Sequence, residues 1–223
     1  MRRMAFVVAL LSLAACAINQ PTVHIDYVDF VQLGGINYVA AWTPPTRPLQ
    51  QSDLGSVYGK VKVKVEGSND PNHRIVDGDA AFLAPGTGVY AVKGYRTSFR
   101  VAATNQGRLT LYEADTNPKA RVGADLLDLA DKVLYIGVNS ETDGRTELAA
   151  IKDPAAVRTL VNEVEAGPVD QTRQPGDGAK YFIDFHMDDG TEVIRAYWPS
   201  SGEMARGIHV PETFRLAITA AVG

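Results

Sequence analysis

Cysteine is almost missing from this chain, because Cys16 is the only one among 223 residues. A single thiol cannot close an internal disulfide, and it cannot supply the paired cysteines of a redox motif or a structural zinc site. The fold must therefore be stabilised by its hydrophobic core, which a chain of this length is large enough to bury.

Positive charge and long apolar runs are also scarce. Lys and Arg total 22 against 26 for Asp and Glu, and the formal net charge is −4. Nucleic-acid binding needs a basic surface, so no nucleic acid is expected as a partner. After the first residues no apolar run approaches the roughly 20 residues that cross a bilayer, so no further membrane span is expected.

Recognisable catalytic and cofactor motifs are lacking. The chain has no Gly-x-Ser-x-Gly, His-Glu-x-x-His or Ser-x-x-Lys arrangement. Gly55–Lys60 is one residue short of a phosphate-binding loop, and Gly86–Ala91 fits a dinucleotide fingerprint only loosely. Strand-like residues follow both, whereas phosphate binding needs a helix N-terminus. We therefore expect no cofactor and interpret these glycines as turn residues.

No metal site is predicted from spacing. The four histidines lie on separate predicted elements, without the spacing of metal ligands: His24, His73, His186 and His209. One loop gathers oxygen side chains of the kind that bind calcium: Asp70, Asn72, Asp77 and Asp79. Their spacing is not that of an EF-hand, so we interpret them as solvated turn residues.

What the chain does have is an export signal. Arg2 and Arg3 precede an apolar stretch of about ten residues, from Ala5 to Ala14, which is typical of a secretory signal peptide. We therefore expect residues 1–15 to be removed as a signal peptide. The alternative is a buried N-terminal helix of the fold.

The single cysteine stands where this signal ends. Leu13-Ala14-Ala15-Cys16 resembles the lipobox of bacterial lipoproteins. The resemblance implies cleavage before Cys16 and lipidation of its sulfur with diacylglycerol, so that residues 16–24 become a lipidated tether. One acyl chain binds membranes only marginally, but two give stable attachment. The implied location is outside the cytoplasm, on the outer face of the cytoplasmic membrane or on an outer membrane. The alternative is an ordinary cysteine in an uncleaved signal.

Residues 25–115 are predicted to form a β-rich domain. Gly34-Gly35 favours a hairpin, and the alternation over Val57–Glu66 predicts one half-buried strand. On that strand the face of Val57, Val61, Val63 and Val65 is expected to be buried, opposite Lys60, Lys62 and Lys64. The lysines would either bind an anionic surface or protect a sheet edge. Further short strands are predicted at Ala80–Leu83, Val89–Val92, Ser98–Ala103 and Arg108–Glu113. This spacing favours an all-β barrel or sandwich.

The C-terminal half has a different pattern. Residues 116–131 are expected to be a connector, in which Ala124–Leu129 is either a helical turn or a short strand. Residues 132–223 predict an α+β domain of order ββαββα, whose first helix begins at Asp153-Pro154 and whose last begins at Val210 or Pro211. The predicted fold class is therefore α+β, mostly antiparallel β, in two domains. One continuous domain is the alternative.

The second hairpin of that half carries the catalytic candidates. A two-residue turn at Asp189-Gly190 would pair Ile183 with Ala196 and Asp184 with Arg195. In this register one face holds the polar side chains Asp184, His186, Arg195 and Tyr197. An acid, a histidine and an arginine together can do acid–base chemistry, so Asp184, His186 and Arg195 are catalytic candidates. The alternative is a structural ion pair beside an exposed histidine. Trp42 and Trp198 are expected in the core.

Two functions fit these features. The first is a membrane-anchored lipoprotein outside the cytoplasm that binds an envelope protein or polymer. The second is an extracytoplasmic hydrolase that uses the face of Asp184, His186 and Arg195. The absence of catalytic motifs favours the first.

Overall fold

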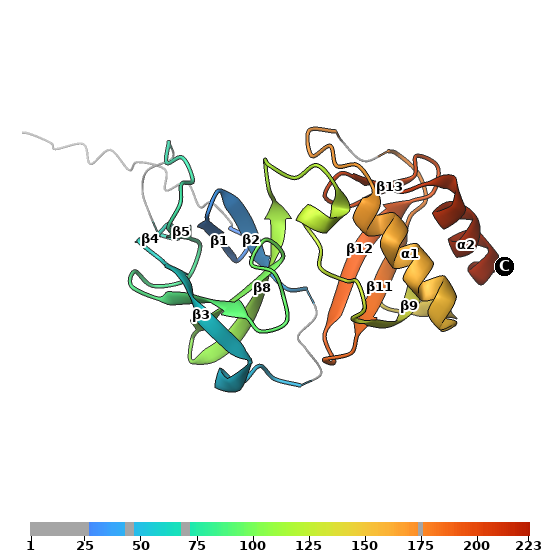
Figure 1. Ribbon diagram of the computed structural model, residues 1–223. Coiled ribbons are helices and arrows are strands. Elements are labelled where there is room, and N and C mark those ends of the chain that lie inside the picture. Colours follow the sequence, from blue (N-terminus) through green and yellow to red (C-terminus); the bar gives the residue numbers. More distant parts are fainter. Residues whose placement is uncertain (1–26, 43–46, 68–71, 174–175) are drawn as a thin grey trace, which may run out of the picture.

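The computed structural model describes residues 27–42, 47–67, 72–173 and 176–223. Within them the fold is α+β and mostly antiparallel β, which confirms the predicted class. An eight-stranded sheet occupies the N-terminal half and a six-stranded sheet with two helices the C-terminal half (Figure 1). The predicted signal peptide, Cys16, the tether and His24 lie outside the described residues.

The first sheet is built from short strands joined mainly by tight turns. They are β1 (Phe30–Leu33), β2 (Ile36–Ala40), β3 (Leu54–Lys60), β4 (Val63–Lys64), β5 (Asp79–Ala80), β6 (Gly88–Val92), β7 (Arg100–Asn105) and β8 (Arg108–Thr116). A short 3-10 helix, η1 (Gln51–Asp53), leads into β3. The order across the sheet is β3-β6-β7-β8-β2-β1-β5-β4, and every pair is antiparallel except β4 with β5.

The predicted first hairpin is confirmed. Phe30 pairs with Val39 and Leu33 pairs with Ile36, so Gly34 and Gly35 form the two-residue turn between β1 and β2. Their φ angles are +61° and +79°. A turn with positive φ at both central positions matches the twist of the strands that it joins, and glycine adopts it without strain.

The two outermost strands of this sheet, β3 and β4, follow each other in the chain. Between them Val61 N donates to Thr87 O (2.9 Å), next to β6, and Lys62 N donates to Gly78 O (2.7 Å), next to β5. The segment thus leaves one edge of the sheet and joins the other. As a result the sheet curls into a partly closed barrel, as the strand spacing predicted.

The prediction of one continuous strand over Val57–Glu66 is wrong. Val61 and Val65 are buried, but Val57 is 54% exposed and Val63 is 42% exposed. The crossing between β3 and β4 reorients the backbone, so residues of equal parity do not share a face. The lysines of this segment remain exposed, and Lys64 Nζ lies 2.6 Å from Glu66 Oε2.

The connector contains one 3-10 helix, η2 (Gly123–Asp125), followed by irregular chain. Of the two structures expected there, the helical turn is present but short. Asp125 Oδ2 accepts hydrogen bonds from Arg121 N (2.8 Å) and Val122 N (3.1 Å), which fixes the turn. The leucines that follow η2 are buried in the core: Leu126, Leu127 and Leu129.

The second half has the predicted order ββαββα with one additional short hairpin. Its elements are β9 (Val133–Asn139), β10 (Glu147–Ile151), α1 (Pro154–Ala166), β11 (Tyr181–Met187), β12 (Glu192–Trp198), β13 (Glu203–Met204), β14 (Ile208–His209) and α2 (Glu212–Val222). The strand order is β10-β9-β11-β12-β13-β14. The β13–β14 hairpin is the part that the sequence did not predict.

Helix α1 begins as its sequence predicts. Asp153 is the N-cap, its Oδ1 accepts a hydrogen bond from Ala156 N (2.9 Å), and Pro154 occupies the first helical position, where no N–H is needed. Its buried stripe has helical spacing: Val157, Leu160, Val161 and Val164. This stripe packs the helix on β9 and η2.

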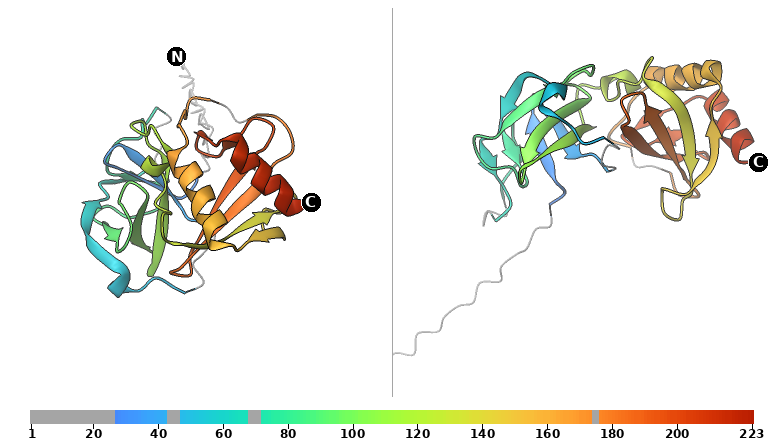
Figure 2. Two further views of the ribbon diagram at one scale, coloured as in Figure 1. Left: turned by 45° about the vertical axis from the view of Figure 1, so that its right-hand side comes forward. Right: turned by 90° about the horizontal axis from the view of Figure 1, so that it is seen from below.

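Both helices lie on the same side of the six-stranded sheet (Figures 1 and 2). Ile183, Phe185, Val193 and Tyr197 form the covered face, and the ring of Tyr197 meets that of Phe214 of α2 at 5.2 Å. We call the opposite face, which carries Asp184 and His186, the outer face. Neither α1 nor α2 covers it.

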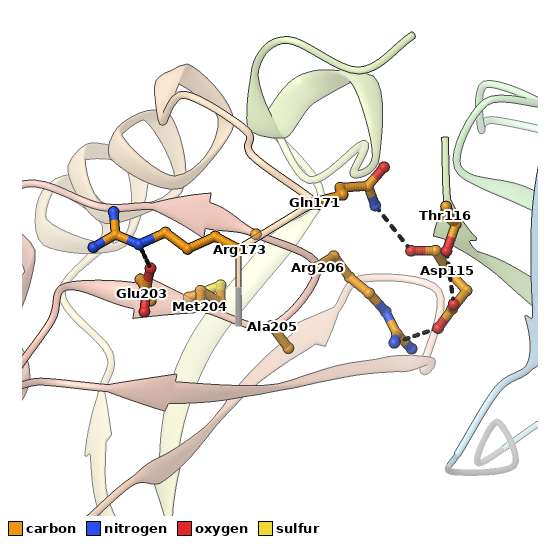
Figure 3. A pocket seen from close by; sticks show the side chains of 9 residues that line it. Asp115, Thr116, Gln171, Arg173, Glu203, Met204, Ala205 and Arg206 are labelled. Carbon is orange, nitrogen blue, oxygen red and sulfur yellow. Dashed lines mark hydrogen bonds and ion pairs between the residues drawn. The ribbon is translucent and has the colours of Figure 1, made fainter. Parts of the chain in front are cut away.

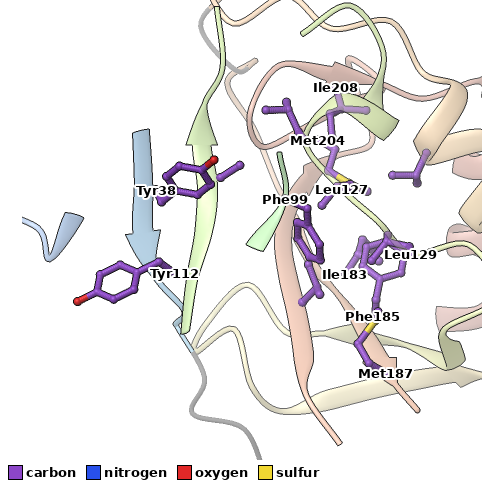
Figure 4. Packing of buried hydrophobic residues seen from close by; sticks show 14 of the residues in the cluster. Tyr38, Phe99, Tyr112, Leu127, Leu129, Ile183, Phe185, Met187, Met204 and Ile208 are labelled. Atoms are coloured by element: carbon purple, nitrogen blue, oxygen red, sulfur yellow. The ribbon is translucent and has the colours of Figure 1, made fainter. Parts of the chain in front are cut away.

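One hydrophobic cluster runs through both halves. It joins Tyr38 and Tyr112 of the barrel to Leu127, Ile183 and the helices. Figure 4 draws Phe99, which directly precedes β7, close to Leu127 of the connector and Ile183 of the second half. The two sheets therefore share a core.

An ionic cluster reinforces this contact between the sheets. Glu113 of β8 lies between Arg100 of β7 and Arg195 of β12, at 2.8 Å from Arg100 Nη2 and 3.1 Å from Arg195 Nη2. Arg100 Nη1 also donates to Thr191 Oγ1 (2.7 Å). Burial alone would raise the pKa of Glu113, but the two arginines outweigh burial and lower it.

Candidate functional site

The hairpin that carries the predicted site has a different register from the predicted one. Ile183 pairs with Arg195 and Asp184 pairs with Ile194, one residue away from the expected partners. Met187 N donates to Thr191 O (2.9 Å), so the loop spans three residues and includes Gly190 at φ +79°. A shift of one residue turns the side chains of one strand to the other face relative to its partner.

This shift separates the predicted catalytic residues. Asp184 and His186 lie on the outer face, but Arg195 and Tyr197 lie on the covered face. Arg195 donates to Glu113 Oε2 from both Nη1 and Nη2, each at 3.1 Å. The prediction that Asp184, His186 and Arg195 share one face is therefore wrong, and Arg195 belongs to the contact between the sheets.

His186 is surrounded by carboxylates on the outer face. Its Nε2 lies 3.4 Å from Asp184 Oδ2 and 3.9 Å from Glu147 Oε2, and its Nδ1 lies 3.6 Å from Glu192 Oε1. The imidazole stacks on Tyr135, with ring centres 3.9 Å apart and planes 10° apart. Strands β9 to β12 thus position one imidazole among three acidic side chains.

Asp184 is the most buried member of this group. Its side chain is 6% exposed. Burial raises its pKa to about 6; the neighbouring His186 opposes that shift, and the nearby Glu192 and Glu147 add to it. Asn139 Nδ2 approaches Asp184 Oδ2 at 3.5 Å. Within the described residues, neither Asp184 Oδ1 nor His186 Nε2 has a hydrogen-bond partner.

A glycine of the neighbouring strand faces these atoms. Gly137 of β9 pairs with Asp184 of β11. A Cβ at position 137 would lie 3.0 Å from Glu147 Oε2, 3.3 Å from His186 Nε2 and 3.4 Å from Asn139 Oδ1. Three polar atoms therefore converge on a point of the sheet where no side chain stands.

Aromatic side chains continue the outer face at the other end of the strands. The ring of Trp42 meets that of Phe182 at 6.2 Å, and Lys180 Nζ lies 5.7 Å from the Phe182 ring and 5.9 Å from the Trp198 ring. Trp42 is 65% exposed and Trp198 is partly buried. The prediction that both tryptophans belong to the core is therefore wrong for Trp42.

The other acidic candidates have structural partners. Asp79 Oδ2 lies 2.7 Å from His73 Nε2 and accepts a hydrogen bond from Val76 N (2.9 Å). Asp77 Oδ1 accepts from Gly35 N (2.9 Å), which ties this loop to the first hairpin. Asp70 lies outside the described residues. The described members fix the loop, and no three of them lie close enough together to hold a metal ion.

A cavity of about 170 Å³ lies where the halves meet beside β13 (Figure 3). Its charged side chains pair with one another, because Arg206 binds Asp115 and Arg173 Nε lies 2.8 Å from Glu203 Oε1. Gln171 Nε2 donates to Asp115 O (3.1 Å). Arg206 Nε is buried without a hydrogen-bond partner among the described residues, but the charges here are already paired, so this cavity is a weaker candidate than the outer face.

No protein-family profile, curated protein or solved structure matches this chain. In the part of the chain that the structure describes, no helix is long and apolar enough to span a membrane.

Sequence reasoning found two residues of this site and missed the others. Alternation along β11 identified Asp184 and His186, but Glu147, Tyr135 and Asn139 come from neighbouring strands whose order the sequence does not give. Glu192 pairs with His186 only in the three-residue-loop register. Chemically, the outer face offers carboxylates, an imidazole and exposed aromatic rings, which suits it to bind a cation or a polar ligand.

Proposed function

We propose that this protein is a lipid-anchored, extracytoplasmic binding protein whose outer face binds an envelope polymer. The lipobox-like motif Leu13–Cys16 supports the anchor. One observation carries the binding role: among the described residues, two buried atoms without a hydrogen bond, Asp184 Oδ1 and His186 Nε2, lie beside aromatic rings on a sheet face that neither helix covers. Buried polar atoms without partners are rare in folded proteins, so a pair of them on such a face favours a ligand that completes them.

The chemistry of the outer face favours a glycan. A sugar ring has a flat apolar face and a rim of hydroxyl groups. Trp42 and Phe182 offer apolar surface to the first, and the carboxylates of Asp184 and Glu192 accept hydrogen bonds from the second. Binding at this face requires no catalytic arginine, which agrees with the position of Arg195 in the sheet contact. The hydrolase hypothesis loses that third residue.

The anchor is tested by mass spectrometry of the protein isolated from its native membranes. We expect a mature N-terminus at Cys16 whose mass includes a diacylglycerol group. We also expect Cys16→Ser to move the protein from the membrane fraction to the soluble fraction, because both acyl chains are lost. An unmodified Cys16 in the membrane-bound protein would contradict the anchor.

The ligand is tested with the chain's own fluorescence, since both of its tryptophans border the outer face. Purified cell-wall glycan fragments titrated into the protein should change the emission with saturation. Trp42→Ala should weaken binding at least tenfold, because it removes the exposed ring. Val57→Ala, an exposed apolar position on the barrel, is the control and should bind as the wild type does. Equal affinity of both variants and the wild type would refute the assignment of this face.

A further inference from the structure

The outer face also brings together side chains of the types that bind metal ions, although their spacing in the sequence did not suggest this. Asp184, His186 and Glu192 each place one donor atom within 4.8 Å of the other two. Glu147 Oε2 adds a fourth donor, 3.9 Å from His186 Nε2. These residues come from β10, β11 and β12, and β9 lies between β10 and β11 in the sheet.

The two ring nitrogens of His186 face different carboxylates. Glu192 Oε1 lies 3.6 Å from Nδ1, whereas Asp184 and Glu147 lie on the side of Nε2. In metal sites a carboxylate at one imidazole nitrogen holds the proton there, so that the other nitrogen offers its lone pair to the ion. Glu192 Oε1 lies just beyond hydrogen-bond distance of Nδ1 and would take this positioning role by approaching it more closely, which leaves Nε2 as the ligand atom.

The spacing of the atoms around Nε2 fits a small ion. Ligand bonds of about 2.0–2.1 Å in a tetrahedral site place neighbouring donor atoms about 3.3–3.4 Å apart. Asp184 Oδ2 lies 3.4 Å and Glu147 Oε2 lies 3.9 Å from Nε2. Both distances from Nε2 are close to that spacing, and Gly137, which has no Cβ, faces the same atoms.

The charge at this point also calls for a cation. Three carboxylates surround one imidazole, and the side chain of Asp184 is only 6% exposed. A buried carboxylate is costly unless a positive charge or hydrogen bonds compensate it. Among the described residues Asp184 Oδ1 has no partner and is free to bind an ion.

We propose that His186 Nε2, Asp184 and Glu147 bind a divalent transition-metal ion above Gly137, with Glu192 as the positioning residue at Nδ1. One nitrogen and two carboxylates favour Zn²⁺ over Ca²⁺, which takes six to eight oxygen ligands. Three protein ligands leave a coordination position open for water or for a ligand on the outer face. This inference shares the outer face with the proposed function but needs neither the lipid anchor nor the glycan.

Isothermal titration of ZnCl₂ into the untagged, chelator-treated full chain tests the proposal. We expect one Zn²⁺ per chain and at least 100-fold weaker binding of Ca²⁺. His186→Ala and Asp184→Asn should lower the Zn²⁺ affinity at least 100-fold. Glu192→Gln should lower it by about 10- to 100-fold, as is typical when a positioning partner is lost. His209→Ala and Asp188→Asn change exposed groups outside the cluster and should bind Zn²⁺ as the wild type does.

Two further measurements make the outcome independent of folding defects. Glu147 is 41% exposed in its side chain, so Glu147→Gln should keep the wild-type circular dichroism and still lose at least tenfold in Zn²⁺ affinity. Zn²⁺ should raise the melting temperature of the wild type but not of Asp184→Asn. Absence of saturable Zn²⁺ binding to the folded wild type, or wild-type affinity in folded His186→Ala or Glu147→Gln, would overturn the site. Because no glycan is present, either result leaves the glycan proposal standing.

Discussion

At the scale of single residues, Glu113 links the two sheets. Its buried carboxylate is shared by Arg100 and Arg195, which come from different sheets. Such a cluster is expensive to desolvate, so its net contribution to stability is modest. Removing one member is strongly destabilising, because the remaining charges stay buried without a partner.

We therefore expect Glu113→Gln to lower the free energy of unfolding by about 3–5 kcal/mol at pH 7, measured by urea denaturation. The control is Glu66→Gln, which removes an exposed carboxylate that is paired with Lys64. Exposed ion pairs contribute little, so the control should unfold at the wild-type urea concentration. Equal midpoints for both variants would show that the buried cluster does not hold the sheets together.

The lowered pKa of Glu113 predicts that the stability of the protein depends on pH. The arginines lower the pKa of Glu113 below its ordinary value of 4.5, so the unfolded chain binds this proton more readily than the folded one. Its contribution is present above pH 4.5 and is lost as the pH falls through the lowered pKa. The difference in stability between wild type and Glu113→Gln should thus shrink below pH 4.5. A difference that stays constant down to pH 3 would contradict this assignment.

At the scale of elements, local signals in the sequence predicted most helices and strands but not how they pair. Asp153-Pro154 and the apolar stripe fix α1, and Gly34-Gly35 fixes the first hairpin, because these preferences act within a few residues. The continuous strand over Val57–Glu66 failed because the barrel crosses from one sheet edge to the other there. That crossing depends on distant strands.

In the second hairpin, too, contacts with distant residues decide how the strands pair, and here they affect the candidate site. Asp189 Oδ1 accepts hydrogen bonds from Thr191 N (2.8 Å) and Thr191 Oγ1 (2.6 Å), and Tyr95 OH from the barrel donates to Asp189 Oδ2 (2.7 Å). These contacts favour the three-residue loop over the two-residue turn that Asp-Gly suggests. The register, and with it the membership of the site, is therefore decided partly by the other half of the molecule.

At the scale of the whole molecule, the barrel and the six-stranded sheet share one hydrophobic cluster and one ionic cluster. The sequence suggested two domains, with one continuous domain as the alternative. A shared core couples the unfolding of the parts that contribute to it.

We expect scanning calorimetry of the chain at pH 7 to give one transition, with equal calorimetric and van't Hoff enthalpies. Phe99→Ala should lower the temperature of that single transition, because it leaves a cavity in the fully buried core where the halves meet. Two resolved transitions in the wild type would instead mean that the halves unfold separately.

The passage of β3 directly into β4 has a consequence for contacts between copies of the protein. The proposed lipid anchor would bring neighbouring copies to a high local concentration, where an unpaired edge strand is a template for lateral polymerisation. The two edge strands of the barrel, β3 and β4, are consecutive in the chain and are interrupted where the chain crosses between the edges. Exposed lysines line this segment: Lys60, Lys62 and Lys64. The short edges thus offer another strand little backbone to pair with, and the like charges repel an identical copy, which favours dense packing without polymerisation into fibres.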